Sequence, residues 1–364
     1  MVRISNLLSG AGRLVGPRLQ RTYLAPVLFP RSWLRRVLVL VAVVVAIAAP
    51  FFASEYLLAI AIAVGIGLLG AVPTNLLIGV AGQASVGNAA FMAIGAFASA
   101  ETTLYWNWPL IASILAGGAA AGIVGVVVGI PAMRVRGLYL VVTTLALHYV
   151  AIYVLTVYQT NRVGVGGFIL PLVEFGPLNT QQSSYYMVLV GAVIFMIVMR
   201  NLLRTRFGRA WTAIARDEIA AGVLGVRVNR QKVTVFGLSS VMIGIQGALF
   251  GYYLGVVTID PFTFALAVSF VAMIVIGGIG STFGTFIGAL FVVGLPYAVT
   301  TVAGFLPANI AAELTSSLSN FEVLLYGAAI VLFLILEPRG LVFLWQRLTA
   351  AVASWPLGRS REQG

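Results

Sequence analysis

The stretch PLIASILAGGAAAGIVGVVVGIP, residues 109–131, runs for 23 residues without a charged side chain. A helix rises about 1.5 Å per residue, so a helix of this length can cross the roughly 30 Å hydrocarbon core of a bilayer. The whole chain has the same character, because 60% of its 364 residues are hydrophobic and only 9% are charged. A soluble domain carries about 25% charged residues. The sequence therefore predicts an integral membrane protein.

Similar apolar runs lie on both sides of this stretch. Each is about as long as a membrane-spanning helix requires. We therefore expect an all-α, polytopic transmembrane helical bundle of about ten spans. The expected spans are residues 37–54, 57–80, 87–105, 109–131, 137–160, 185–202, 233–255, 264–280, 283–303 and 320–337.

Two stretches are too polar or too rich in glycine for a plain lipid-facing helix. Irregular backbone at membrane depth is tolerated only inside protein or beside a water-filled cavity, so we expect broken or re-entrant helices at both. In the stretch 73–95, half-helix N-termini could meet a carboxylate, or the glycines could serve close helix packing. The second stretch is GGIGSTFGTFIG at 277–288. The first, 73–95, contains Pro73, Asn75, Gly79, Gly82, Gln83, Ser85, Gly87 and Asn88.

The net charge of +12 is distributed unevenly. Of the 22 lysines and arginines, 21 lie in residues 1–36, 134–136, 200–232 or after residue 338, and only Arg162 lies elsewhere. Cytoplasmic segments of membrane proteins carry such an excess, so we expect both termini in the cytoplasm and no nucleic-acid partner. The expected organisation is a basic cytoplasmic segment at 1–36, a membrane domain at 37–338 and a cytoplasmic tail at 339–364. A disordered basic tail is the alternative for residues 1–36.

Several kinds of chemistry are excluded by residues that the chain lacks. It has no cysteine and a single histidine, His148, so we expect no metal site. Its only lysine, Lys232, lies between Gln231 and Val233, so there is no phosphate-binding loop. The acids fall at span ends or in loops, and no catalytic set can be assembled inside the spans. We expect no enzyme and no cofactor, but a transporter or channel that is passive or driven by another protein.

The segment 200–232, RNLLRTRFGRAWTAIARDEIAAGVLGVRVNRQK, is much more polar than its neighbours. Residues 210–224 are good helix formers, and Gly225 is placed to end the helix. A plain connector needs only about 4–6 residues. A helix here could dock into a groove on a soluble partner, with Asp217 and Glu218 offering charges to it. The alternative is a solvated loop that only sets the topology.

Within this segment, FGRAWTAIARDEIAAGVLGVRVNRQKVTVFGLSS at 207–240 resembles the coupling loop of branched-chain amino-acid ABC transporter permeases of the LivM type. The resemblance extends over about residues 55–345. It includes NLLIGVAGQASVGNAAFMAIGAFASA at 75–100, VRGLYLVVTTLAL at 135–147, TIDPFTFALAVSFVAMIVIGGIGSTFGTFIGA at 258–289 and LEPRGL at 336–341.

This resemblance implies a permease subunit in the bacterial cytoplasmic (inner) membrane. The implied partners are a second permease subunit of the LivH type, two ATPase subunits that use the ATP, and an extracytoplasmic solute-binding protein. The residues expected to make the ATPase contact are Phe207, Gly208, Arg209, Arg216, Asp217, Glu218, Ala221 and Gly225.

For an amino-acid substrate, uncharged polar groups would let a zwitterion pass without trapping it. The expected pathway residues are therefore Asn75, Gln83, Ser85, Asn88, Thr143, Thr144 and His148. The two threonines could instead bond back to their own helix, and His148 could bond a neighbouring carbonyl. The alternative functions are an ABC permease for urea, short amides or another small polar solute, a passive channel, and a membrane scaffold.

Overall fold

The computed structural model describes residues 33–132, 137–303 and 340–342. The chain divides into two units, Met1–Ala48 and Ala49–Gly364. Helix α1, Trp33–Phe52, begins in the first unit and carries Pro50 near its end. The expected segments 1–36 and 339–364 lie almost entirely outside the described residues, as does the expected span 320–337, so these stay predictions.

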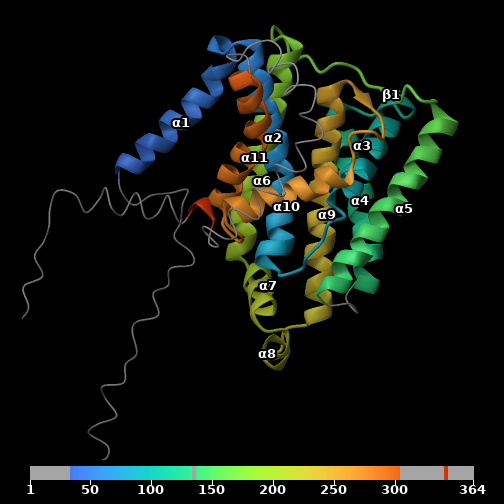
Figure 1. Ribbon diagram of the computed structural model, residues 1–364, viewed down its shortest axis with the longest axis vertical. Helices are drawn as coiled ribbons and strands as arrows, with labels where there is room; N and C mark the ends of the chain where they lie inside the picture. Colours follow the sequence, from blue (N-terminus) through green and yellow to red (C-terminus); the bar gives the residue numbers. More distant parts are fainter. Residues whose placement is uncertain (1–32, 133–136, 304–339, 343–364) are drawn as a thin grey trace, which may run out of the picture. The chain divides into compact units, whose positions relative to one another are not determined.

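Within its described residues, the second unit consists of helices and their connecting loops, with one short antiparallel ladder (Figure 1). Strands β1 (Phe168–Ile169) and β2 (Val256–Val257) pair with Phe168 opposite Val257. The helices are α2 (Glu55–Thr74), η4 (Asn75–Val80), α3 (Asn88–Leu104), α4 (Leu110–Ala132), α5 (Leu138–Arg162), α6 (Thr180–Arg204), α7 (Arg206–Arg216), α8 (Glu218–Val223), α9 (Val228–Leu254), α10 (Phe264–Gly277) and α11 (Thr282–Ala303).

The expected spans coincide closely with helices wherever the chain is described. The expected span 87–105, for example, is α3, and 137–160 is α5. Among the described residues, five helices are long and apolar enough to cross a membrane: α2 with η4, α4, α5, α6 and α9. The shorter α10 and α11 are also apolar. The multi-pass helical fold is thus confirmed, whereas the count of ten spans is not.

Helix α9 packs against α2, α3 and α4 in the core of this unit. The close approach depends on glycines. A Cβ atom added at Gly95 would collide with the backbone of Gly244, and one added at Gly247 would collide with the carbonyl of Met92. Small residues let membrane helices approach in this way, because there is little hydrophobic driving force between helices in lipid.

Both stretches expected to be irregular do interrupt their helices. After Pro73, which has no N–H to donate, α2 continues as the π-helix η4 and then as the non-helical loop 81–87. The carbonyl of Pro73 accepts a hydrogen bond of 2.9 Å from the hydroxyl of Ser239 on α9. The second interruption separates α10 from α11, where Gly278 and Gly280 have φ values of 115° and 80° that favour glycine.

Candidate functional site

Asn75 joins the two interruptions. Its Nδ2 donates hydrogen bonds to the Thr285 hydroxyl (2.8 Å) and the Ser281 carbonyl (3.2 Å). Its Oδ1 accepts one from the backbone N–H of Gly280 (2.8 Å). Asn75 is fully buried, so this amide fastens η4 to the turn between α10 and α11, 205 residues away in sequence.

Asn88 begins α3 on the other side of the loop and is also buried. Its Nδ2 donates to the hydroxyl of Thr74 at 2.7 Å, and that hydroxyl donates to the carbonyl of Gly70 at 2.7 Å. The Oδ1 of Asn88 has no partner among the described residues. The amide therefore holds the start of α3 against α2, and its Oδ1 is available to accept a hydrogen bond.

The loop 81–87 lies against α5 through Thr144. The hydroxyl of Thr144 accepts a hydrogen bond from the N–H of Val86 at 3.2 Å and donates one to the carbonyl of Val141 at 3.0 Å. Ser85 is buried, and its oxygen accepts from the N–H of Gly87 at 3.4 Å. Thr144 therefore bonds both to the polar loop and back to its own helix.

The remaining two pathway candidates also lie on α5. His148 is one helical turn beyond Thr144 and is buried, and its Nδ1 has no partner among the described residues. Its ring centroid lies 6.4 Å from that of Phe264. Thr143 donates to the carbonyl of Tyr139 at 2.8 Å, within its own helix. Thr144 thus bonds to the loop 81–87, whereas Thr143 bonds back to its own helix.

Gln246 is a polar residue of this region that the sequence analysis did not single out. It is completely buried in α9, and its Nε2 donates to the carbonyl of Ile66 at 3.1 Å. Its Oε1 is unpartnered among the described residues. Gly70 leaves the space that this side chain occupies, because an added Cβ would lie 2.6 Å from Nε2. A single amide in the apolar run 233–255 is the signal that could have found it.

The single helix expected at residues 210–224 is divided in the structure. Helices α7 and α8 meet there at Asp217. Asp217 has an extended backbone, and its Oδ1 accepts hydrogen bonds from the N–H groups of Ile219 (2.9 Å) and Ala220 (3.0 Å). A carboxylate that caps a helix in this way competes with continuation of the helix before it. Gly225 follows α8 with a φ of 85°, in keeping with its expected role as the helix end.

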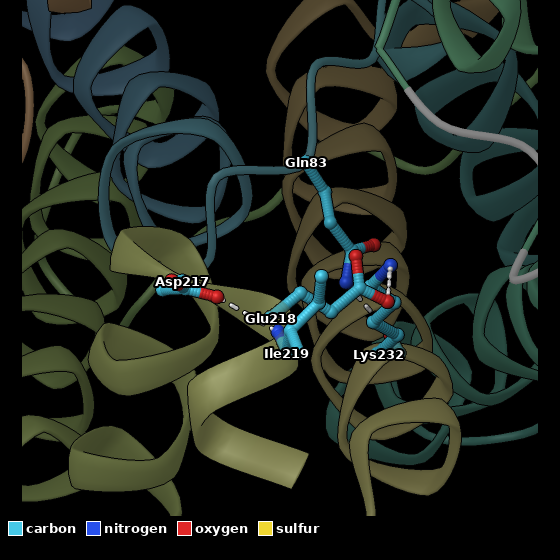
Figure 2. A network of polar contacts seen from close by, with 5 residues as sticks. All are labelled: Gln83, Asp217, Glu218, Ile219 and Lys232. Atoms are coloured by element: carbon cyan, nitrogen blue, oxygen red, sulfur yellow. Dashed lines mark hydrogen bonds and ion pairs between the residues drawn. The ribbon is translucent and has the colours of Figure 1, made fainter. Parts of the chain in front are cut away.

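Glu218 and Lys232 link α8 to the start of α9, as Figure 2 shows. The Nζ of Lys232 lies 2.7 Å from Oε1 of Glu218, and the carbonyl of Lys232 accepts a hydrogen bond of 3.3 Å from Nε2 of Gln83. A Cβ added at Gly82 would lie 3.1 Å from that of Ala215 on α7. The loop 81–87 therefore contacts the segment 200–232 at two points. Both acids that were expected to reach a partner protein make contacts within the chain.

The other coupling candidates divide into packing residues and exposed ones. Phe207 lies beside the buried Trp211, with ring centroids 6.2 Å apart, and Arg209 donates to the carbonyl of Arg204 at 3.0 Å. Gly208 is needed because an added Cβ would collide with the carbonyl of Leu202.

Helix α8 presents a different surface from the one expected. Ala221, which was expected to approach a partner closely, is 2% exposed and faces into the chain. Arg216 is exposed at the end of α7. The apolar side chains that α8 and the residue after it expose are Ile219, Val223 and Leu224, which are 74%, 84% and 81% exposed. We call these three residues the apolar tip.

Residues 56–334 match the sequence profile of a family described as the branched-chain amino acid transport system / permease component. The chain belongs to this family. It is 28% identical over 339 residues to the permease protein LivM of the high-affinity branched-chain amino acid transport system of Escherichia coli K12, covering 85% of this chain and 76% of LivM.

Two further relatives match shorter parts of the chain. The LivH permease protein of the same Escherichia coli system is 30% identical over 34% of this chain and 39% of its own length. The xylose transport system permease protein XylH of Haemophilus influenzae is 30% identical over 32% of this chain and 33% of its own length. No solved structure matches the chain significantly. The chain is therefore a permease component of an ABC importer, a kind of subunit that is not an enzyme, and a multi-pass inner-membrane protein.

Proposed function

We propose that this permease moves branched-chain or related amino acids into the cell, driven by separate ATPase subunits. The observation that carries the substrate assignment is the family match over residues 56–334, together with the similarity to LivM along most of the chain. The uncharged character of the buried polar residues supports it. Amide and hydroxyl groups can hydrogen-bond both ends of a zwitterion, whereas a fixed charge would hold one end and slow its release.

The proposed pathway is formed by Asn75, Gln83, Ser85, Asn88 and Thr144, with His148 one turn further along α5. Support comes from the burial of these side chains and from two polar atoms that have no hydrogen-bond partner among the described residues, Oδ1 of Asn88 and Nδ1 of His148. A buried acceptor without a donor costs about 1–3 kcal/mol. A passing ammonium group or water would satisfy it. Thr143, which bonds back to its own helix, is the weakest member of the expected set.

The proposed ATPase contact is the apolar tip of α8. Exposed apolar side chains on a short helix suit insertion into a groove of a soluble partner. In this proposal Asp217 and Glu218 orient the tip, because Asp217 caps α8 and Glu218 pairs with Lys232. Movement of the tip would then reach the loop 81–87 through Gln83 and Gly82.

The remaining partners follow from the same proposal. A second permease subunit of the LivH type completes the pathway, two ATPases hydrolyse ATP, and an extracytoplasmic solute-binding protein delivers the substrate. Both termini and the segment 200–232 lie in the cytoplasm, in keeping with the position of 21 of the 22 basic residues. The chain itself carries no cofactor and contacts no nucleic acid.

The experiment is uptake into proteoliposomes that contain the complete complex, with ATP inside and the binding protein outside. Labelled leucine, isoleucine and valine should accumulate only with ATP, and urea should not. Accumulation of urea or a short amide in their place would overturn the substrate assignment. Equal solute movement through this chain alone, without ATPase or ATP, would overturn the importer mechanism in favour of a channel.

A further inference from the structure

The exposed face of α5 carries an ordered stripe of side chains. All members are exposed within the part of the chain that the structure describes, and they are spaced alternately by four and three residues. A repeat of 3.5 residues is the spacing at which one helix packs along another with a left-handed crossing. We call this set the α5 stripe, and its members are Val142, Ala146, Tyr149, Tyr153, Thr156 and Thr160.

Two members of the α5 stripe are out of place in lipid. Tyr149 and Tyr153 are 59% and 71% exposed. At a rise of about 1.5 Å per residue they lie about 16 and about 22 Å from Leu138, near the middle of α5. Tyrosine is enriched at the two membrane surfaces, where its ring is buried and its hydroxyl meets water. A tyrosine side chain near the middle of α5 cannot reach either membrane surface. The hydroxyls of Tyr149 and Tyr153 therefore each need a polar partner within the membrane.

The threonines of the stripe differ from the tyrosines in this respect. Thr156 donates to the carbonyl of Ile152 at 2.8 Å, and Thr160 donates to the carbonyl of Thr156 at 2.9 Å. Both hydroxyls are thus satisfied within the helix. A tyrosine hydroxyl is too far from its own backbone for such a bond, and neither Tyr149 nor Tyr153 has a hydrogen-bond partner among the described residues.

The exposed faces of two other long helices provide an internal comparison. The exposed residues near the middle of α4 are aliphatic, such as Ile123 and Val127. Those near the middle of α6 are aliphatic too, such as Val190 and Ile194. These faces suit lipid. Helix α5 is also the least buried of the five long helices, at 17% of its apolar window against 67% for α2 and α9. Its exposed surface carries valines, such as Val150 and Val154, together with the two tyrosines.

We infer that the α5 stripe packs against a membrane helix of the second permease subunit, which places the hydroxyls of Tyr149 and Tyr153 in the subunit interface. The occupant is an apolar helix that carries small or hydroxyl-bearing residues at the same 3.5-residue spacing. Ala146 leaves room for close approach, and the tyrosine hydroxyls select a partner with hydrogen-bonding groups over lipid. A homologous permease subunit fits this chemistry, because this chain is similar to both LivM and LivH of one transport system.

This inference rests on the proposed function for the existence of a second permease, and the test separates the two. Native membranes that contain the complete complex with Tyr149→p-benzoylphenylalanine or Tyr153→p-benzoylphenylalanine are irradiated, and the complex is then purified. Both substitutions keep the aromatic ring. Matched controls carry the same group at Ile123 on α4 or Ile194 on α6. Co-purification of the second permease is measured first, in every variant, because its absence would remove the proposed function itself.

Where the second permease co-purifies, Tyr149 and Tyr153 should crosslink to it several-fold more than Ile123 and Ile194 do. Mass spectrometry should place the adducts on one face of one partner helix. Adducts to lipid alone, to a second copy of this chain or to residues of the same chain would overturn the inference. So would stronger crosslinking from Ile123 or Ile194, while the proposed function would survive each of these results.

Discussion

The Nζ of Lys232 lies 2.7 Å from Oε1 of Glu218, and the backbone carbonyl of the same lysine accepts a hydrogen bond from Gln83. This lysine is the only one in the chain. It joins α8, the start of α9 and the loop that leads into α3 (Figure 2). Force applied to α8 therefore has a direct route to the buried polar loop.

The first prediction concerns this ion pair. The side chain of Lys232 is 12% exposed and that of Glu218 is 23% exposed. Removing one partner should cost about 1–3 kcal/mol, between the values for exposed and buried pairs. Glu218→Gln should therefore reduce the amino acid moved per ATP hydrolysed while the complex still assembles. The ratio of uptake to hydrolysis in proteoliposomes measures this. The exchange Glu218→Lys with Lys232→Glu should restore much of the ratio, and a normal ratio in Glu218→Gln would contradict the prediction.

The second prediction concerns Asn75. Asn75→Leu removes three hydrogen bonds and leaves the N–H of Gly280 without its acceptor, at a cost of about 1–3 kcal/mol for each buried group left unpaired. The purified complex should lose thermal stability and uptake together. Thr285→Val is the matched control, because the second donor contact of Asn75, to Ser281, survives it. Unaltered stability of Asn75→Leu would show that the Asn75 contacts contribute little.

The third prediction tests close helix packing. Gly247→Ala would drive a methyl group into the carbonyl of Met92, and overpacking of this kind costs about 1–3 kcal/mol. Gly222→Ala is the control, because the nearest atom to its added Cβ is 4.0 Å away. In helix α8 that change should be neutral or stabilise by about 0.5–1 kcal/mol. Melting of the purified complex in detergent should therefore shift downward only for Gly247→Ala, and a shared shift would contradict the packing argument.

The fourth prediction concerns orientation. The chain has no cysteine, so a single introduced cysteine reports its own position. Val165→Cys and Val223→Cys lie at sites that are 87% and 84% exposed. An impermeant maleimide should label the first in right-side-out vesicles and the second only after the membrane is opened. Labelling of Val223→Cys in sealed vesicles would reverse the proposed topology.

Much of the fold was predictable because the bilayer sets the length of an apolar helix. The expected span 109–131 and the observed α4 differ by one residue at each end. The interruption near Asn75 was also predictable, because amides and glycines at membrane depth need internal partners. The identity of those partners was not, since nothing in the local pattern pairs Asn75 with Gly280 across 205 residues.

The coupling segment shows why the rest could not be predicted. Residues 210–224 are good helix formers, so intrinsic propensity favours one helix. The side chain of Asp217 overrides this preference by capping α8, which turns the helix axis and buries Ala221. The turn at Asp217 decides which face of the short helix α8 is exposed. The apolar tip could therefore be recognised only from the folded chain.

The central claim is that the apolar tip of α8 transmits work from an ATPase. The most direct measurement attaches a benzophenone maleimide to Val223→Cys, the only cysteine that this variant would contain, and irradiates the assembled complex. The account predicts an adduct between this chain and the ATPase subunit, and none when the group is placed at Val165→Cys. Absence of that adduct from a complex whose uptake is still driven by ATP would contradict the account.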